Sequence, residues 1–111
     1  MSAGPRRSDA FTADFDLQYR WYLKEAGERI AGRYLAAVEK SLQMIGANPR
    51  VGRLRKFHSP VLREIRSLRV MPPFGAHLVF YRQVDDGVFV ERVMHGARDV
   101  AQRLLQPPGN D

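Results

Sequence analysis

Apolar positions in the first half of the chain recur with the period of an amphipathic helix. One stripe lies between Thr12 and Ala26, and a second lies between Glu28 and Ile45. Gly27, a residue that often ends helices, separates the two. The pattern predicts helices at 12–26 and 28–45 that form an antiparallel hairpin, whose apolar faces need a common cover. The first stripe consists of Phe15, Tyr19, Tyr22, Leu23 and Ala26.

The second half changes to short runs of β-branched and aromatic residues, which are typical of strands. Residues 61–70 alternate as a strand with one polar side, but the alternation slips between Ile65 and Leu68. The slip indicates a bulge or a late start of the strand.

Two further apolar runs flank residues 85–87, Asp-Asp-Gly, and Asp-Gly between such runs is the strongest local signal for a β-hairpin. A two-residue turn at Asp86-Gly87 would place Arg82 opposite Glu91 and Leu78 opposite His95. The second strand then ends at His95.

The remaining segments complete an α+β fold. We expect an edge strand within 6–11, a helix cap at Thr12 or Ser8, a basic loop at 50–60 and a short helix at 97–105. The helical hairpin would pack on one face of a three- to four-stranded antiparallel sheet, leaving the other face and the strand ends partly open. The 111 residues suit one domain, 1–111, with 1–7 and 106–111 flexible.

Positive charge is concentrated in one stretch. The formal net charge is +6, and residues 50–69 carry seven cations against Glu64 alone, an excess of six. We call 50–69 the cationic segment. Its charge favours contact with an acidic partner, which is RNA, DNA or an acidic protein segment. Its cations are Arg50, Arg53, Arg55, Lys56, Arg63, Arg66 and Arg69.

The composition excludes several kinds of chemistry. The chain has no cysteine, which rules out disulfides, thiol catalysis and cysteine-based metal sites. Its three histidines lack metal-ligand spacing, so we expect neither a metal nor a cofactor. No segment has the length and apolarity of a signal-peptide core or a membrane span, and we expect a cytoplasmic protein without membrane contact.

The end of the second hairpin strand carries candidate chemistry. Histidine is a common acid or base catalyst, which makes His95 a candidate, and Arg63, Arg82 and Arg98 have side chains that clamp phosphate. These groups could serve metal-free RNA cleavage. The structural alternative is that His95 bonds a backbone carbonyl, Arg82 pairs with Glu91, and Arg98 pairs with a nearby acid.

The aromatic residues of the predicted helices divide into two groups. Tyr19, Tyr22 and Tyr34 lie on the apolar stripes, which favours the core over a nucleic-acid stacking platform. Trp21 falls off the stripe, and an exposed tryptophan suits burial under a partner.

Five small motifs in order resemble the RelE/ParE toxin superfamily, and the ParE branch in particular. The resemblance covers about Phe11 to Leu105. The motifs are Ala13-x-x-Asp16-Leu17, Asn48-Pro49-x-x-Gly52-Arg53, Leu62-Arg63, Phe80-Tyr81-Arg82 and Val93-Met94-His95-Gly96-Ala97-Arg98-Asp99.

The resemblance implies the toxin of a type II toxin–antitoxin system, with a role in plasmid stabilisation. ParE-like members inhibit DNA gyrase without being enzymes, whereas RelE-like members cleave mRNA in the ribosome. The chain has Gly96 where RelE-like enzymes carry a tyrosine or further basic groups, and it lacks their arginine before Phe80, reading Ala76-His77-Leu78. A gyrase inhibitor is therefore the first interpretation, and a ribosome-dependent endoribonuclease using His95 and the arginines is the alternative.

The implied partners are a cognate antitoxin, in a toxin–antitoxin hetero-oligomer, and DNA gyrase. We expect an antitoxin whose C-terminal half is acidic, because that half would pair with the cationic segment. The residues expected to bind target or partner are Arg53, Arg55, Lys56, Arg63, Arg66, Arg69, Trp21, His95 and Arg98.

Overall fold

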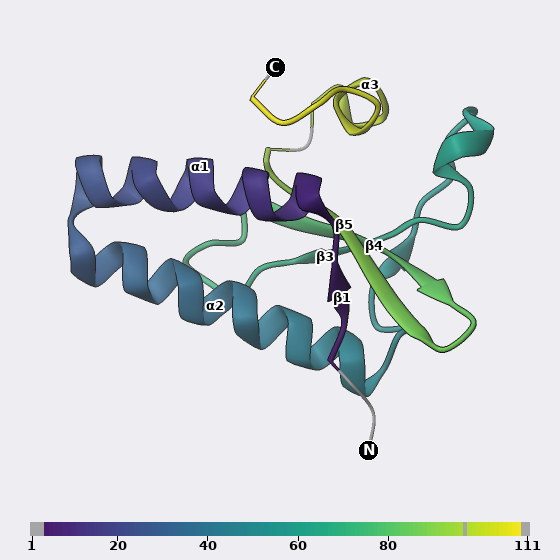
Figure 1. The fold of residues 1–111 in the computed structure, drawn as a ribbon, viewed down its shortest axis with the longest axis horizontal. Coiled ribbons are helices and arrows are strands. Elements are labelled where there is room, and N and C mark those ends of the chain that lie inside the picture. The colour runs from purple at the N-terminus through teal and green to yellow at the C-terminus, as the bar shows by residue number, and fades with distance from the viewer. Residues whose placement is uncertain (1–3, 97, 110–111) are drawn as a thin grey trace.

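The computed structural model describes residues 4–96 and 98–109, and it confirms the α+β architecture (Figure 1). Two antiparallel helices lie against a sheet, and a short helix follows the last strand. In chain order the elements are β1 (Arg6–Arg7), α1 (Asp9–Ala26), α2 (Glu28–Ala47), β2 (Arg53–Leu54), the 3₁₀ turn η1 (Pro60–Leu62), β3 (Arg66–Arg69), β4 (His77–Val84), β5 (Gly87–His95) and α3 (Val100–Leu104).

The helical hairpin forms where the stripes predict it. Of the two caps considered, Ser8 is the one used, since its hydroxyl accepts a hydrogen bond from the backbone N–H of Phe11 at 2.9 Å. Helix α1 therefore begins at Asp9 and not at Thr12. Gly27 joins the helices at a φ of 89°, a conformation that favours glycine.

The sheet has the strand order β1-β5-β4-β3-β2. Strands β3, β4 and β5 form the predicted antiparallel meander, while β1 pairs with β5 in parallel. The sheet has five strands where three or four were expected. The additional edge strand β2 has two residues and lies in the predicted basic loop, because a segment of that length shows no periodicity.

The predicted hairpin register is wrong. Val84 pairs with Gly87, so Asp85 and Asp86 form the turn, Arg82 lies opposite Phe89 and Leu78 lies opposite Met94. Glu91 is the extra residue of a bulge that faces the Phe80–Tyr81 step. The bulge keeps Val90 and Val93, three positions apart, on the same buried side of β5, which an unbroken strand would not allow.

The sheet is packed on both faces, whereas one face was expected to stay partly open. The larger core lies between the helices and the sheet, around Tyr34, Val79 and Tyr81. A smaller core on the other face joins Ile65 and Phe80 to residues of η1 and α3. Of the two explanations offered for the slip in the strand at 61–70, the late start is confirmed. The 3₁₀ turn η1 occupies residues 60–62, and β3 begins only at Arg66.

Segments near both ends of the described chain contact β5. Arg6 and Arg7 pair with Phe89 and Val90, and the carbonyl of Gln106 accepts a hydrogen bond from Arg92. The predicted helix at 97–105 is observed at Val100–Leu104, while Ala97, residues 1–3 and residues 110–111 lie outside the described part. Flexible ends remain a prediction. Within the described part, none of the helices has the length and hydropathy needed to cross a membrane.

Candidate functional site

A groove of about 550 Å³ lies between α1 and the end of β5. Its outer wall is apolar and open, since Leu17 is 52% and Trp21 is 55% exposed. The exposure predicted for Trp21 is confirmed. We call this hollow the α1 groove. Its lining residues are Asp14, Leu17, Gln18, Trp21, Tyr22, Tyr34, His77, Val93, Met94, His95, Arg103 and Gly109.

Two histidines meet at the inner end of the α1 groove. His77 begins β4 and pairs with His95 at the end of β5, and their ring centroids lie 4.8 Å apart. His95 is exposed, whereas His77 is buried and its Nε2 atom lies 2.9 Å from the Tyr22 hydroxyl. Burial, followed by the nearby His95, lowers the pKa of His77 to about 4.

Tyr34 closes the groove from α2. Its ring is fully buried against Tyr22, Phe74 and His77. Its hydroxyl has no hydrogen-bond partner among the described residues, and burial raises its pKa. The tyrosines at Tyr22 and Tyr34 thus belong to the packed inner wall, as the stripe predicted, and not to an open stacking platform.

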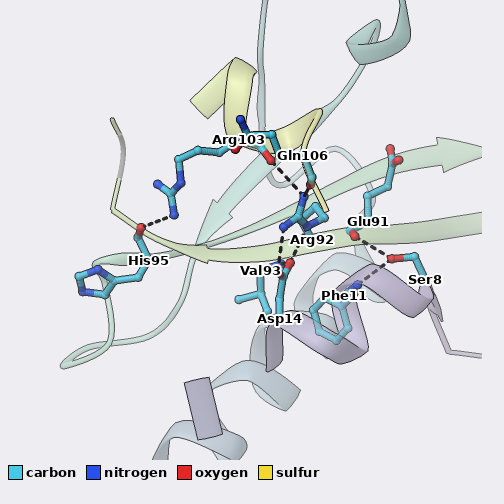
Figure 2. Close-up of polar contacts among 9 residues, drawn as sticks. All are labelled: Ser8, Phe11, Asp14, Glu91, Arg92, Val93, His95, Arg103 and Gln106. Carbon is cyan, nitrogen blue, oxygen red and sulfur yellow. Dashed lines mark hydrogen bonds and ion pairs between the residues drawn. The ribbon is translucent and has the colours of Figure 1, made fainter. Parts of the chain in front are cut away.

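A buried ion pair between Arg92 and Asp14, one of the lining residues, lies beside the α1 groove (Figure 2). Arg92 Nε donates to Asp14 Oδ2 at 2.6 Å, and its Nη2 donates to Oδ1 at 2.9 Å. Its Nη1 donates to the carbonyls of Arg103 and Gln106, so this one side chain joins α1, β5 and the segment after α3. Asp14 also accepts the backbone N–H of Val93 at 3.2 Å, on the edge of β5 beyond β1.

Sequence reasoning missed Asp14, Arg92 and His77. Asp14 and Arg92 are 78 positions apart, and both resemble ordinary surface residues of their elements. The pairing of His77 with His95 was hidden by the register, which depends on the bulge at Glu91. The predicted hairpin brings His77 near His95, but nothing in its sequence marks the bulge that pairs them.

The four residues proposed for RNA cleavage do not share one site. His95 lies opposite the first residue of β4, whereas Arg82 is the sixth residue of that strand, which separates them by about 16 Å at the rise of a strand. The Arg82 guanidinium bonds the Glu91 carboxylate and the carbonyls of Val61 and Arg63. The alternative expected for Arg82, pairing with Glu91, is therefore the observed one.

Arg98 and Arg63 lie at different places. Arg103 donates to the carbonyls of His95 and Arg98. Because His95 and Arg103 line the α1 groove, these contacts place Arg98 beside its rim. Arg63 lies directly after η1. Both side chains are exposed, and neither contacts a carboxylate within the described residues.

None of the cations in the cationic segment forms an ion pair with a carboxylate in the described part of the chain. Arg55 Nη1 donates to Ser67 Oγ at 3.1 Å, Arg66 Nη1 to the Gly52 carbonyl at 2.8 Å, and Arg69 Nη1 to the Gly75 carbonyl at 2.7 Å. These contacts hold the guanidinium groups in place without cancelling their charge. All four ion pairs of the described residues lie elsewhere, at Arg6–Asp86, Arg7–Glu39, Arg82–Glu91 and Arg92–Asp14.

Comparison with known proteins finds a family model and solved structures that resemble this chain. Residues 6–100 match a family model described as the ParE toxin of the type II toxin–antitoxin system parDE. A solved structure of the chromosomal ParDE toxin–antitoxin system from P. aeruginosa has a similar fold, with a TM-score of 0.68 and 16% identity over 85% of this chain and 96% of that one. No curated protein matches the sequence significantly.

Proposed function

This chain belongs to the ParE family of toxins from type II toxin–antitoxin systems, and we propose that it acts by inhibiting DNA gyrase. On this proposal the toxin works by binding and carries out no chemistry of its own. A cognate antitoxin neutralises it, and both act in the cytoplasm.

One observation carries the choice of gyrase over mRNA cleavage. Cleavage without a metal needs an acid, a base and phosphate-clamping cations around one phosphodiester. Here Arg82 is held by Glu91 and two backbone carbonyls, about a strand length from His95. This separation argues against a cleavage site and supports a toxin that acts by binding gyrase. On this proposal His95 and Arg98, at the rim of the α1 groove, contact the target.

We place the antitoxin in the α1 groove. Leu17 and Trp21 present apolar surface beside the exposed imidazole of His95, and aromatic anchors of this kind dominate protein interfaces. An apolar side chain of the antitoxin would enter the groove. The acidic C-terminal half expected for the antitoxin remains a prediction from the charge of this chain.

The decisive experiment adds the full chain to purified gyrase and relaxed plasmid. We expect loss of supercoiling and accumulation of cleaved plasmid, while mRNA in a parallel translation reaction stays intact. Cleaved mRNA together with normal supercoiling would overturn the proposal in favour of the ribonuclease. Induction in cells without antitoxin gives a second readout: filamentation and DNA-damage signalling for gyrase, or an immediate arrest of protein synthesis for RNA cleavage.

A matched pair of variants tests the rim. Arg98→Gln removes an exposed cation beside the α1 groove, and Arg29→Gln removes an exposed cation from α2. We expect a loss of gyrase inhibition of tenfold or more, a ΔΔG of about 1.4 kcal/mol, for Arg98→Gln alone. If the two variants inhibit gyrase equally, Arg98 is not part of the surface that contacts gyrase.

A further inference from the structure

Three arginines lie on one side of the sheet edge formed by β2 and β3. Ile65 belongs to the core that faces away from the helical hairpin, and side chains two residues apart share a side of a strand, which places Ser67 and Arg69 with it. Arg53 pairs with Ser67, and the backbone N–H of Arg55 bonds the Ile65 carbonyl. Paired residues of antiparallel strands project to the same side.

We call Arg53, Arg55 and Arg69 the cationic face. Arg55 is held by Ser67 and by the ring of Phe57 at 5.5 Å, and Arg69 is held by the Gly75 carbonyl. Each guanidinium has five N–H donors, so most of them remain unused by these contacts. Fixed guanidinium groups lose less conformational entropy when they bind an anion.

Two acids of the chain, Glu64 and Asp85, lie on the other side of this sheet edge. Glu64 and Asp85 line a hollow together with Arg50 and Arg66, and Arg66 projects to the side of the helical hairpin because it pairs with Tyr81 of the larger core. None of the three arginines of the cationic face forms an ion pair with a carboxylate among the described residues.

We propose that the cationic face binds the phosphate backbone of duplex DNA. Arg53 and Arg55, two positions apart, are about 7 Å apart along the strand, and Arg69 lies on the neighbouring strand. A row of uncompensated arginines suits a polymer with regularly repeated negative charges, and arginine contacts to phosphate require no base sequence. The choice of duplex DNA among phosphodiesters rests on the proposed function, since DNA is the substrate of gyrase.

The test measures binding of the full chain to a fluorescent DNA duplex by anisotropy, without gyrase. With three phosphate contacts, we expect log Kd to change with log salt concentration with a slope of about 3. The double variant R53Q/R69Q should lower the slope by about 2 and weaken binding at low salt at least tenfold. R29Q/R33Q removes the same charge from exposed positions on α2 and should leave the slope unchanged.

Three results would overturn the proposal: no salt-dependent binding of DNA by the wild-type chain, equal losses in the two double variants, or tighter binding of an RNA duplex. Equal thermal unfolding of both variants shows that folding is not the cause. Gyrase inhibition without DNA binding would refute this inference and leave the proposed function standing. DNA binding without gyrase inhibition would support this inference and refute the proposed function.

Discussion

His77 and His95 lie edge to face across the first residue pair of β4 and the end of β5, with 69° between their ring planes. One ring is buried and the other is exposed, although the two residues are direct neighbours. The buried ring is therefore held neutral, while the exposed ring remains accessible at the rim of the α1 groove. This difference makes the stability of the fold depend on pH.

We expect the free energy of unfolding to fall as the pH drops from about 6.5 to 4. The pKa of His77 is about 4 in the folded chain and about 6.5 when unfolded, so the unfolded chain binds more protons within this window. The loss should be about 2 to 3 kcal/mol, fully present only below pH 4. Urea titrations of the wild type and His77→Gln across this window isolate the contribution. A variant with the same pH dependence as the wild type would contradict it.

Removal of Asp14 should be strongly destabilising. Asp14→Asn removes a negative charge from beside the buried Arg92 guanidinium, and breaking a buried ion pair typically costs about 3 to 5 kcal/mol. The matched control is Arg7→Gln, which breaks an exposed pair with Glu39 and should cost less than about 1 kcal/mol. The midpoints of urea unfolding measure both. Similar midpoints for the two variants would show that the buried pair is not a major contributor.

Gly52, within the cationic segment, is the glycine with the least room for a β-carbon. A β-carbon there would lie 2.6 Å from the Tyr81 hydroxyl and 2.9 Å from the Ser67 carbonyl oxygen. Gly52→Ala should therefore lower stability by about 1 to 3 kcal/mol. Gly32→Ala, in α2 with no atom within 4 Å of the added carbon, should raise it by about 0.5 to 1 kcal/mol. Thermal unfolding should move in opposite directions, and a shift in the same direction would refute the steric argument.

Trp21→Ala tests the α1 groove as the antitoxin site. The side chain is more than half exposed, so we expect little change in unfolding and a loss of antitoxin affinity of about 30-fold or more, the range of an interface hot spot. Leu35→Ala, on an exposed part of α2 outside the groove, is the control. Isothermal titration with the purified antitoxin gives the two affinities. If Trp21→Ala binds the antitoxin as tightly as the wild type does, the antitoxin does not bind at the α1 groove.

Local patterns predicted the elements of this fold because their causes are local. The stripes of 12–26 and 28–45 follow from helix periodicity, and the hairpin follows from two apolar runs around Asp-Asp-Gly. The register was not predictable in the same way. It depends on a bulge at Glu91, which is favoured only once Val90 and Val93 must both face the same core.

The candidate site was predictable in part for a similar reason. Trp21 and His95 stand out by residue type, and the structure places both on the α1 groove. Asp14 and Arg92 have no local signal, because their contact is created by packing α1 across β5. The separation of Arg82 from His95, in contrast, was already implied by the predicted hairpin, in which His95 faces Leu78, four positions from Arg82.

The contact of Asp14 with the backbone N–H of Val93 also bears on self-association. Beyond the two residues paired with β1, the outer rim of β5 would offer unpaired amide groups to any passing strand, the usual starting point of aggregation. A carboxylate anchored by Arg92 occupies one of those amides, and a charged group at this position repels an incoming backbone carbonyl. The Asp14 side chain, which joins α1 to β5, thus also hinders other strands from adding to the edge of β5 and starting a fibril.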